Sequence, residues 1–295
     1  MHEPPPPRIY GIFAREAPVG VVFRRGPSAW VELIRLDLAN DRAERGAWFH
    51  GRVYEDRSDL SPDGDLLVYV AAKHANTDAS YGYVWTAVSR PPWMTALALW
   101  PKNDTYYGGG LFEGPRDLWL DVAYGEPVAH PRHPEGPLTV RVDWRDEMLE
   151  AQRLARDGWT TVSASPLAKE ALKRVPRDGL VRERPTGAAG TVLRCTAPRY
   201  GEPAYALVRD GDVQPLPGVT WAEVDPGRGL VLERDGRLLR MDARGREVRE
   251  IADLAADRPD PRPAPDWARQ WPHARRTGRR RRSSVPGGRV SGGRT

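Results

Sequence analysis

The stretch that decides the fold is "DLSPDGDLLVYVAAK", residues 59–73. Its first part is a polar turn that contains Pro62 and Gly64, and its second part is a short apolar run rich in β-formers. An apolar run of this length next to turn residues is typical of a buried β-strand. The stretch therefore predicts a tight turn that leads directly into a strand.

The same residues also resemble the start of a calcium-binding loop. Counted from Asp59, oxygen-bearing side chains occupy positions 1, 3 and 5 and a glycine occupies position 6, as in an EF-hand. Position 12, however, is Val70 where a bidentate glutamate is needed, and Pro62 lies within the loop. The turn and strand account for residues 61–72 without an ion, so we predict no metal site here.

Further along the chain, tight-turn signals recur. The tripeptide Arg-Asp-Gly occurs four times, at residues 156–158, 177–179, 209–211 and 234–236. Asp-Gly supplies the positive φ angles that tight hairpins require. The last copy lies between "GLVLE" and "RLLRM", which predicts a hairpin, and "GVVF" and "WVELIRL" predict another.

A longer recurrence consists of a small or apolar residue, a proline, a polar turn and a strand. The four prolines are Pro62, Pro115, Pro176 and Pro226, spaced 53, 61 and 50 residues apart. Such periods are typical of propeller blades. The segment "LSPDGDLLVYVA" resembles the blade motif of bacterial β-propellers of the WD-repeat and prolyl-oligopeptidase type. That resemblance implies a turn followed by an inner strand buried on both faces, and it implies nothing about function.

We therefore predict a mostly-β protein with a propeller-like ring of about five antiparallel blades over residues 8–258. Residues 1–7 are expected to be an extended proline-rich lead-in, and residues 259–272 a linker with a short helix from Asp266. The alternative is two smaller β-domains that join near residue 135. The segment "RDEMLEAQRLA", residues 145–155, has helical periodicity and predicts either a helical insertion or a domain break.

Composition indicates a soluble chain. It has 295 residues, of which 40% are hydrophobic, and its apolar runs are too short for a membrane span. A single cysteine, Cys195, excludes an internal disulfide framework, so we expect a reducing cytoplasm, and the 41 arginines against 4 lysines are typical of the codon bias of a GC-rich bacterial genome. The net charge of +5 arises from nine arginines between Trp267 and the C-terminus, without which it is −4. Residues 273–295 are predicted to be a disordered basic tail.

The sequence offers little catalytic signal. It contains no nucleophile elbow, zinc-protease motif, phosphate loop or dinucleotide fingerprint. His130 and His133, in "HPRHP", have the spacing of metal ligands, but the flanking prolines predict a solvated loop. Cys195 lies in a predicted strand and is expected to be a small core residue. We expect no metal and no cofactor.

The most unusual composition lies between Tyr81 and Trp119, where aromatic residues are concentrated. Two strands, "YVWTAVS" and "MTALALW", are predicted there, and the loop between the second strand and Trp119 carries two adjacent tyrosines and three glycines. Tyrosines beside polar residues are typical of protein interfaces. The candidate binding residues are Lys102, Asn103, Asp104, Tyr106, Tyr107 and Phe112.

The leading hypothesis is a non-catalytic binding or scaffold protein that engages a protein partner through residues 101–113. The alternative is an enzyme with its site at the propeller channel, where the candidate acids and bases are Asp59, Asp104, Asp117, His50 and His74. A third hypothesis is weak, salt-sensitive nucleic-acid binding through the arginine-rich tail.

Overall fold

A computed structural model describes residues 7–74, 78, 80–102, 104–122, 127–143, 148–163, 180–198 and 202–273. Within these ranges the chain is mostly β, as predicted, and its strands form five sheets of three to five strands. The predicted tail and lead-in lie outside these ranges, except for residues 7 and 273.

Sheets 1 and 2 are antiparallel, and their strands are ordered as in the chain. Sheet 1 contains β1 (Arg8–Phe13), β2 (Val19–Arg25), β3 (Trp30–Asp37) and β4 (Arg42–His50). Sheet 2 contains β5 (Arg52–Leu60), β6 (Leu67–Ala72), β7 (Val84–Ser89) and β8 (Ala96–Lys102). The strands predicted from "LLVYVAA", "YVWTAVS" and "MTALALW" correspond to β6, β7 and β8, and are confirmed.

Sheet 3 departs from this pattern. It contains β9 (Gly110–Phe112), β10 (Asp117–Asp121) and β11 (Thr139–Asp143), and β10 pairs with β11 in parallel. A parallel pair cannot be joined by a hairpin and needs a long crossover connection. The connection between β10 and β11 is that crossover, and its described residues Val122 and 127–132 line one side of the pocket described below.

The second half of the chain contains the only α-helix among the described residues, α1 (Leu149–Arg156), and two more antiparallel sheets. Sheet 4 contains β12 (Thr160–Ser163), β13 (Leu180–Pro185), β14 (Thr191–Ala197), β15 (Ala204–Arg209) and β16 (Asp212–Pro215). Sheet 5 contains β17 (Val219–Asp225), β18 (Gly229–Arg234), β19 (Arg237–Met241) and β20 (Glu247–Asp253). A single 3-10 turn, η1 (Asp266–Arg269), follows, where a short helix was predicted.

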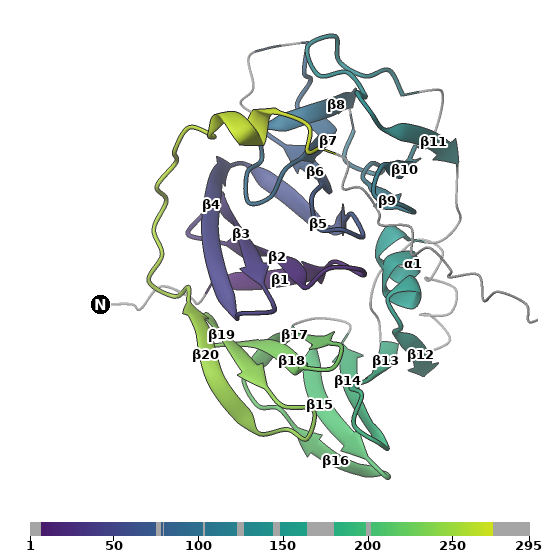
Figure 1. Cartoon of the computed structure of the whole chain (residues 1–295), viewed down its shortest axis with the longest axis vertical. Helices are drawn as coiled ribbons and strands as arrows, with labels where there is room; N and C mark the ends of the chain where they lie inside the picture. The colour runs from purple at the N-terminus through teal and green to yellow at the C-terminus, as the bar shows by residue number, and fades with distance from the viewer. Residues whose placement is uncertain are drawn as a thin grey trace, which may run out of the picture.

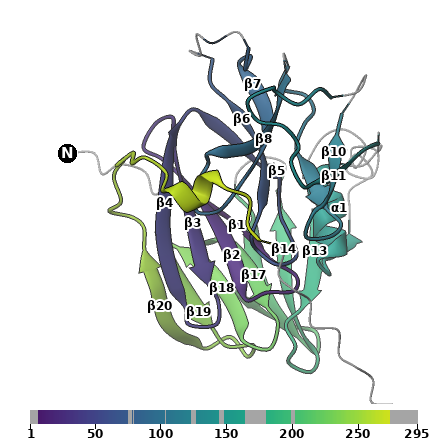
Figure 2. The same cartoon turned by 45° about the horizontal axis from the view of Figure 1, so that its top comes forward.

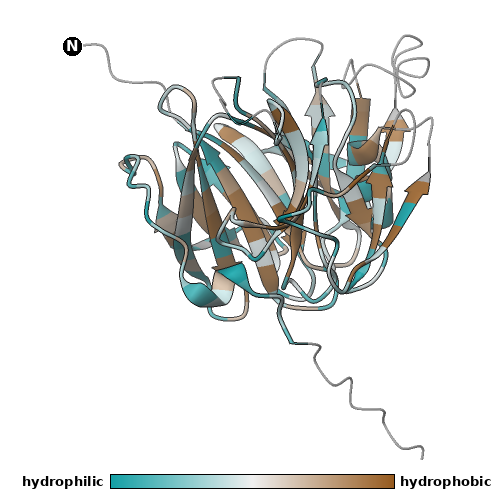
Figure 3. Cartoon of the chain, turned by 90° about the horizontal axis from the view of Figure 1, so that it is seen from above, coloured by the Kyte–Doolittle hydropathy of each residue, from teal (hydrophilic) through white to brown (hydrophobic). Residues whose placement is uncertain are grey.

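The first strands of several sheets lie toward the middle of the molecule (Figure 1). Strand β1 packs against β5 and β17, and β5 packs against β9. Helix α1 lies against β5 and β9, on the side that faces sheet 4. After β20 the chain passes along sheet 1 to η1 (Figure 2). Figure 3 shows that the hydrophobic residues concentrate in the strands.

Strand β6 shows why the opening stretch sets the fold. All six of its residues are buried, because β5 and β7 pair with both of its edges and neighbouring layers cover both of its faces. The turn before it is held by side chains: Ser61 Oγ donates to Asp63 Oδ1 at 2.6 Å and accepts the Leu66 N–H at 2.9 Å. Gly64 has a φ of +75°, which favours glycine. The predicted turn and strand are confirmed.

Two predicted Arg-Asp-Gly hairpins are confirmed and one is wrong. Residues 209–211 connect β15 to β16, and residues 234–236 connect β18 to β19. Residues 156–158 instead end α1, where Gly158 has a φ of +94° and follows the last helical turn. The left-handed residue that serves a hairpin also terminates a helix. Residues 177–179 lie outside the described ranges.

Three of the recurring prolines occupy equivalent positions. Pro62, Pro115 and Pro226 each lie between the first and second strands of a sheet. Pro18, which is not among the four recurring prolines of the sequence analysis, lies at the same position between β1 and β2. Pro176 falls outside the described residues.

Hydrophobic packing links the two halves of the chain. One buried cluster combines Ile9, Val22 and Ile34 from sheet 1 with Val231 and Leu238 from sheet 5. Residues on both sides of position 135 therefore share a core.

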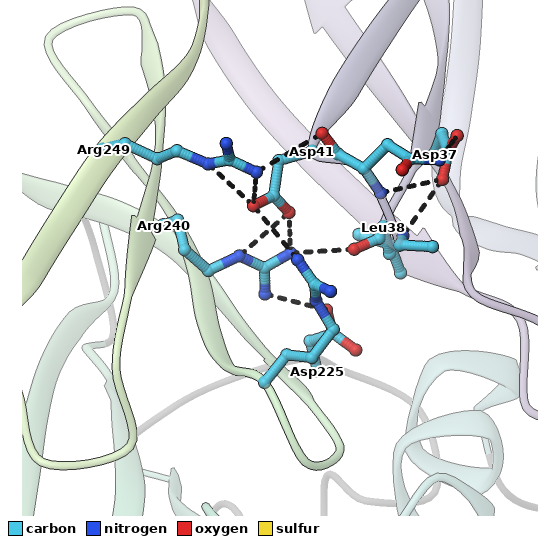
Figure 4. Close-up of polar contacts among 9 residues, drawn as sticks. Asp37, Leu38, Asp41, Asp225, Arg240 and Arg249 are labelled. Atoms are coloured by element: carbon cyan, nitrogen blue, oxygen red, sulfur yellow. Dashed lines mark hydrogen bonds and ion pairs between the residues drawn. The ribbon is translucent and has the colours of Figure 1, made fainter.

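The same junction carries a buried ionic cluster centred on Asp41, in the turn between β3 and β4 (Figure 4). The Asp41 carboxylate is 2% exposed and accepts hydrogen bonds from Arg240, Arg249 and Arg228 of sheet 5. Arg240 Nη1 also donates to Asp225 Oδ2 at 2.8 Å. These arginines hold the pKa of Asp41 below its usual value, although burial alone would raise it.

Candidate functional site

The predicted binding loop follows β8 and ends at β9. Asp104 Oδ1 accepts the Tyr106 N–H at 2.9 Å, which fixes the turn, and the Tyr106 side chain is 80% exposed. Arg57 Nη1 donates to the Thr105 carbonyl at 2.5 Å. The loop therefore presents a large aromatic ring on a hydrogen-bonded turn.

The glycines of this loop allow close backbone approach. A Cβ at Gly109 would lie 2.0 Å from the Arg57 carbonyl oxygen, and one at Gly110 would lie 2.3 Å from that of Trp119. The Gly109 N–H donates to Thr86 Oγ1 at 2.9 Å. Gly108, Gly109 and Gly110 are all buried, so the loop is held in the protein directly after Tyr107.

The other candidate residues divide between surface and core. Lys102 and Tyr107 are half-buried, and Asp104 is exposed and forms an ion pair with Lys102 at 3.5 Å. Phe112 is fully buried, which corrects its assignment to a binding surface. Its ring packs in a core cluster with Leu66, Leu118 and Leu120. Asn103 lies outside the described residues.

The crossover beside this loop is also ordered by hydrogen bonds, which corrects the predicted solvated loop at "HPRHP". The His130 N–H donates to the Leu99 carbonyl at 2.8 Å, and the Leu99 N–H donates to the His133 carbonyl at 3.1 Å. The crossover thus covers the outer edge of β8, and His130 is 5% exposed. The prolines stiffen a segment that the parallel β10–β11 pair brings against sheet 2.

Tyr81 joins the two histidines. Its ring stacks on His130 with centroids 4.3 Å apart and an interplanar angle of 14°. Its hydroxyl lies 3.2 Å from His133 Nε2. Burial lowers the pKa of His133, so this imidazole favours its neutral form. The histidines pack and hydrogen-bond within the protein.

A serine near His130 does not have the geometry of a nucleophile. His130 Nδ1 accepts the Arg132 N–H at 3.2 Å, so in the neutral ring Nε2 carries the proton and donates to Ser80 Oγ, 3.2 Å away. Ser80 Oγ in turn donates to Asp78 Oδ1 at 2.6 Å. A general base would have to accept the serine proton, and here the histidine donates one.

An open pocket of about 790 Å³ lies between the crossover and strands β7, β8 and β10. Val122 and Ala129, which are half-buried, contribute apolar surface, and Thr86, Lys102 and Asp121 contribute polar groups. Burial lowers the pKa of the Lys102 ammonium, opposed by Asp104 and Asp121. Burial raises the pKa of the Asp121 carboxyl, opposed by Arg57 and Lys102. Two incompletely hydrated charges of opposite sign therefore share one pocket.

Sequence reasoning missed Asp121, Thr86 and the role of the crossover. Asp121 follows directly after the apolar run "LWL". A carboxylate at the end of an apolar run indicates a strand that ends with a charge at the edge of its sheet. The position of Thr86 beside Lys102 depends on the pairing of β7 with β8, which no local pattern encodes.

The five candidate acids and bases of the enzyme hypothesis are dispersed. No hydrogen bond or ion pair given by the described structure joins any two of Asp59, Asp104, Asp117, His50 and His74. Asp59 is fully buried, and Arg156 of α1 donates to both of its oxygens at 2.8 Å. It also accepts the Phe112 N–H at 2.8 Å. Asp59 is therefore engaged in holding α1 and β9 against β5.

Helix α1 places a second arginine at the middle of the molecule. Arg153 is 2% exposed and donates to the Ser58 carbonyl and to the Tyr10 hydroxyl. The Tyr10 hydroxyl donates to Glu150 at 3.1 Å. Side chains of α1 therefore hydrogen-bond to both β1 and β5.

Within the described ranges, no group of three or more His, Cys, Asp or Glu side chains is arranged to hold a metal ion. Cys195 is partly buried and packs against the core of sheets 4 and 5. None of the described helices has the length and apolar character needed to cross a membrane.

Comparison with known proteins finds no protein-family model that matches this chain and no curated protein with significant similarity to it.

Proposed function

We propose that this protein is a non-catalytic binding protein, built on a propeller-like ring of five sheets, that engages a protein partner. The binding surface, called here the Tyr106 surface, consists of Asp104, Tyr106, Tyr107 and Val128. The observation that carries the proposal is Tyr106, an 80% exposed aromatic residue on a turn fixed by Asp104.

Three observations support the ring. The sheets follow one another in chain order, the last sheet packs against the first, and the recurring prolines lie in equivalent hairpins. Between sheets 3 and 4 lies α1. A crystal structure tests this architecture: five sheets around one axis are expected, and an open arrangement would contradict it.

The energetics of the Tyr106 surface favour a protein partner. Val128, on the crossover, is 79% exposed and lines the same pocket as Asp104, whose carboxylate accepts the Tyr106 N–H. Tyrosine buries a large area on binding and loses little conformational entropy. The Asp104 hydrogen bond fixes the backbone beneath the ring before a partner arrives, which reduces the entropy lost on association.

The test is affinity capture from native lysate with the full chain as bait. Three baits are compared: the unmodified chain, Tyr106→Ala, and the control Val213→Ser. Val213 is 52% exposed on β16 and represents an apolar surface residue of another sheet. We expect a stoichiometric partner with the unmodified chain and the control, lost with Tyr106→Ala, and then confirmed with purified components. Equal capture by all three baits contradicts the proposal.

A further inference from the structure

The pocket beside the Tyr106 surface holds two charged groups on either side of Gly108. The Gly108 N–H donates to the Asp121 carboxylate. A Cβ at Gly108 would lie 2.9 Å from Lys102 Cε and 3.0 Å from Thr86 Oγ1. The ammonium and the carboxylate therefore flank a single residue, yet no ion pair of 4.0 Å or less joins them in the described part of the chain.

Other charges near the pocket are already engaged. Arg57 Nη1 donates to the carbonyls of Thr105 and Tyr107, and its guanidinium lies over the Tyr54 ring. Lys102 is 3.5 Å from Asp104, whose side chain is 49% exposed, so this is a loose and water-accessible pair. An ammonium has three donors, and Lys102 keeps capacity for a second acceptor.

The charges that line the pocket balance among the described residues. Lys102 and Arg132 are positive, and Asp104 and Asp121 are negative. A ligand with a net charge would leave one sign without compensation, whereas a ligand with one charge of each sign offers a partner to both Lys102 and Asp121, which are half-buried. Since the two groups flank one residue, the charges of the ligand must also be close together.

We propose that this pocket binds an apolar α-amino acid as its zwitterion, with the ammonium on Asp121 and the carboxylate on Lys102. The side chain lies against Val122 and Ala129, which are half-buried and supply an apolar wall. Thr86 is held by the Gly109 N–H and completes the polar floor. This inference goes beyond the proposed protein partner and does not depend on it.

Isothermal titration calorimetry of the full chain tests the ligand class with glycine, L-leucine and L-phenylalanine. We expect saturable binding of L-leucine or L-phenylalanine with a Kd at or below about 1 mM, and weaker binding of glycine. N-acetyl-L-leucine lacks the ammonium and L-leucine amide lacks the carboxylate. Each should bind at least tenfold more weakly, because each lacks the charge that would contact Asp121 or Lys102.

Variants test the assigned residues. Asp121→Asn and Lys102→Met should each weaken binding of the amino acid at least tenfold. Matched controls are Asp117→Asn, at the opposite end of β10, and Lys73→Met, an exposed lysine after β6; both should leave the Kd unchanged. Thermal unfolding of every variant shows whether the fold is intact.

The inference is overturned if none of the three amino acids binds with a Kd below about 10 mM. It is equally overturned if N-acetyl-L-leucine binds as tightly as L-leucine. It is also overturned if the two pocket variants fold normally and bind as the unmodified chain does. Tyr106→Ala should retain amino-acid binding, so loss of the protein partner and failure of the pocket are measured separately.

Discussion

The Asp41 cluster and the pocket that contains Lys102 and Asp121, called here the Gly108 pocket, both bring opposite charges together at the junction of two sheets. They differ in how those charges are paired. At the Asp41 cluster every buried charge has a partner, and Asp41 itself accepts hydrogen bonds from three arginines. In the pocket, Lys102 and Asp121 are both partly desolvated and are not paired with each other. Paired buried charges hold sheets together, whereas separated ones are available to a ligand.

The largest expected effect is at the Asp41 cluster. Asp41→Ala should lower the free energy of unfolding by about 3 kcal/mol, because it leaves the buried Arg240 with Asp225 alone. Urea denaturation measures the change. The control Asp260→Ala removes an exposed ion pair with Arg262 and should cost less than about 1 kcal/mol. Equal effects of the two substitutions would show that the cluster does not stabilise the junction.

A buried glutamate extends the comparison because, unlike Asp41, it has no ion pair with an arginine among the described residues. Glu32 on β3 is 1% exposed, and its Oε2 has no hydrogen-bond partner among the described residues. Burial raises the pKa of Glu32 to about 7, and nearby Asp257 adds to the shift. Since the folded protein holds this proton more tightly than the unfolded chain, stability should fall as the pH rises from about 4.5 through about 7.

Glu32→Gln removes the free-energy cost of ionising this buried carboxyl at high pH. It should raise the free energy of unfolding by about 2 kcal/mol at pH 8, with solvent screening allowed for, and by little below pH 4.5. Urea denaturation at several pH values gives the two curves. A gain that is the same at pH 4 and pH 8 would mean that ionisation of Glu32 is not its source.

A smaller effect on stability is expected in the pocket. Asp121→Asn should change the free energy of unfolding by less than about 1 kcal/mol, because the lost charge has no ion-pair partner and its desolvation cost is also removed. The same urea experiment as for Asp41 makes the comparison direct. A loss as large as that of Asp41→Ala would place Asp121 among the structural charges.

The smallest effect is expected at the Tyr106 surface. Tyr106→Ala should shift the free energy of unfolding by less than about 0.5 kcal/mol, because the ring is 80% exposed. Thermal unfolding checks this. A marked loss of stability would show that the ring packs against the protein and would remove the main argument for a binding surface.

Local patterns were sufficient for part of the β-structure. Short apolar runs and turn residues predicted β6, β7, β8 and the two Asp-Gly hairpins of sheets 4 and 5, because apolar runs and positive φ are properties of short segments. They also placed Tyr106 in an exposed loop, since adjacent tyrosines cannot both face one core.

Long-range pairing was beyond the reach of these patterns. The parallel pairing of β10 with β11 requires the crossover that buries His130 and forms the pocket, and Arg156 reaches Asp59 from 97 residues away. The sequence by itself therefore determined several of the strands and turns, through the conformational preferences of neighbouring residues. Only the tertiary structure decided which sheet edges meet, and so which charges are paired with one another, because those contacts join residues far apart in the chain.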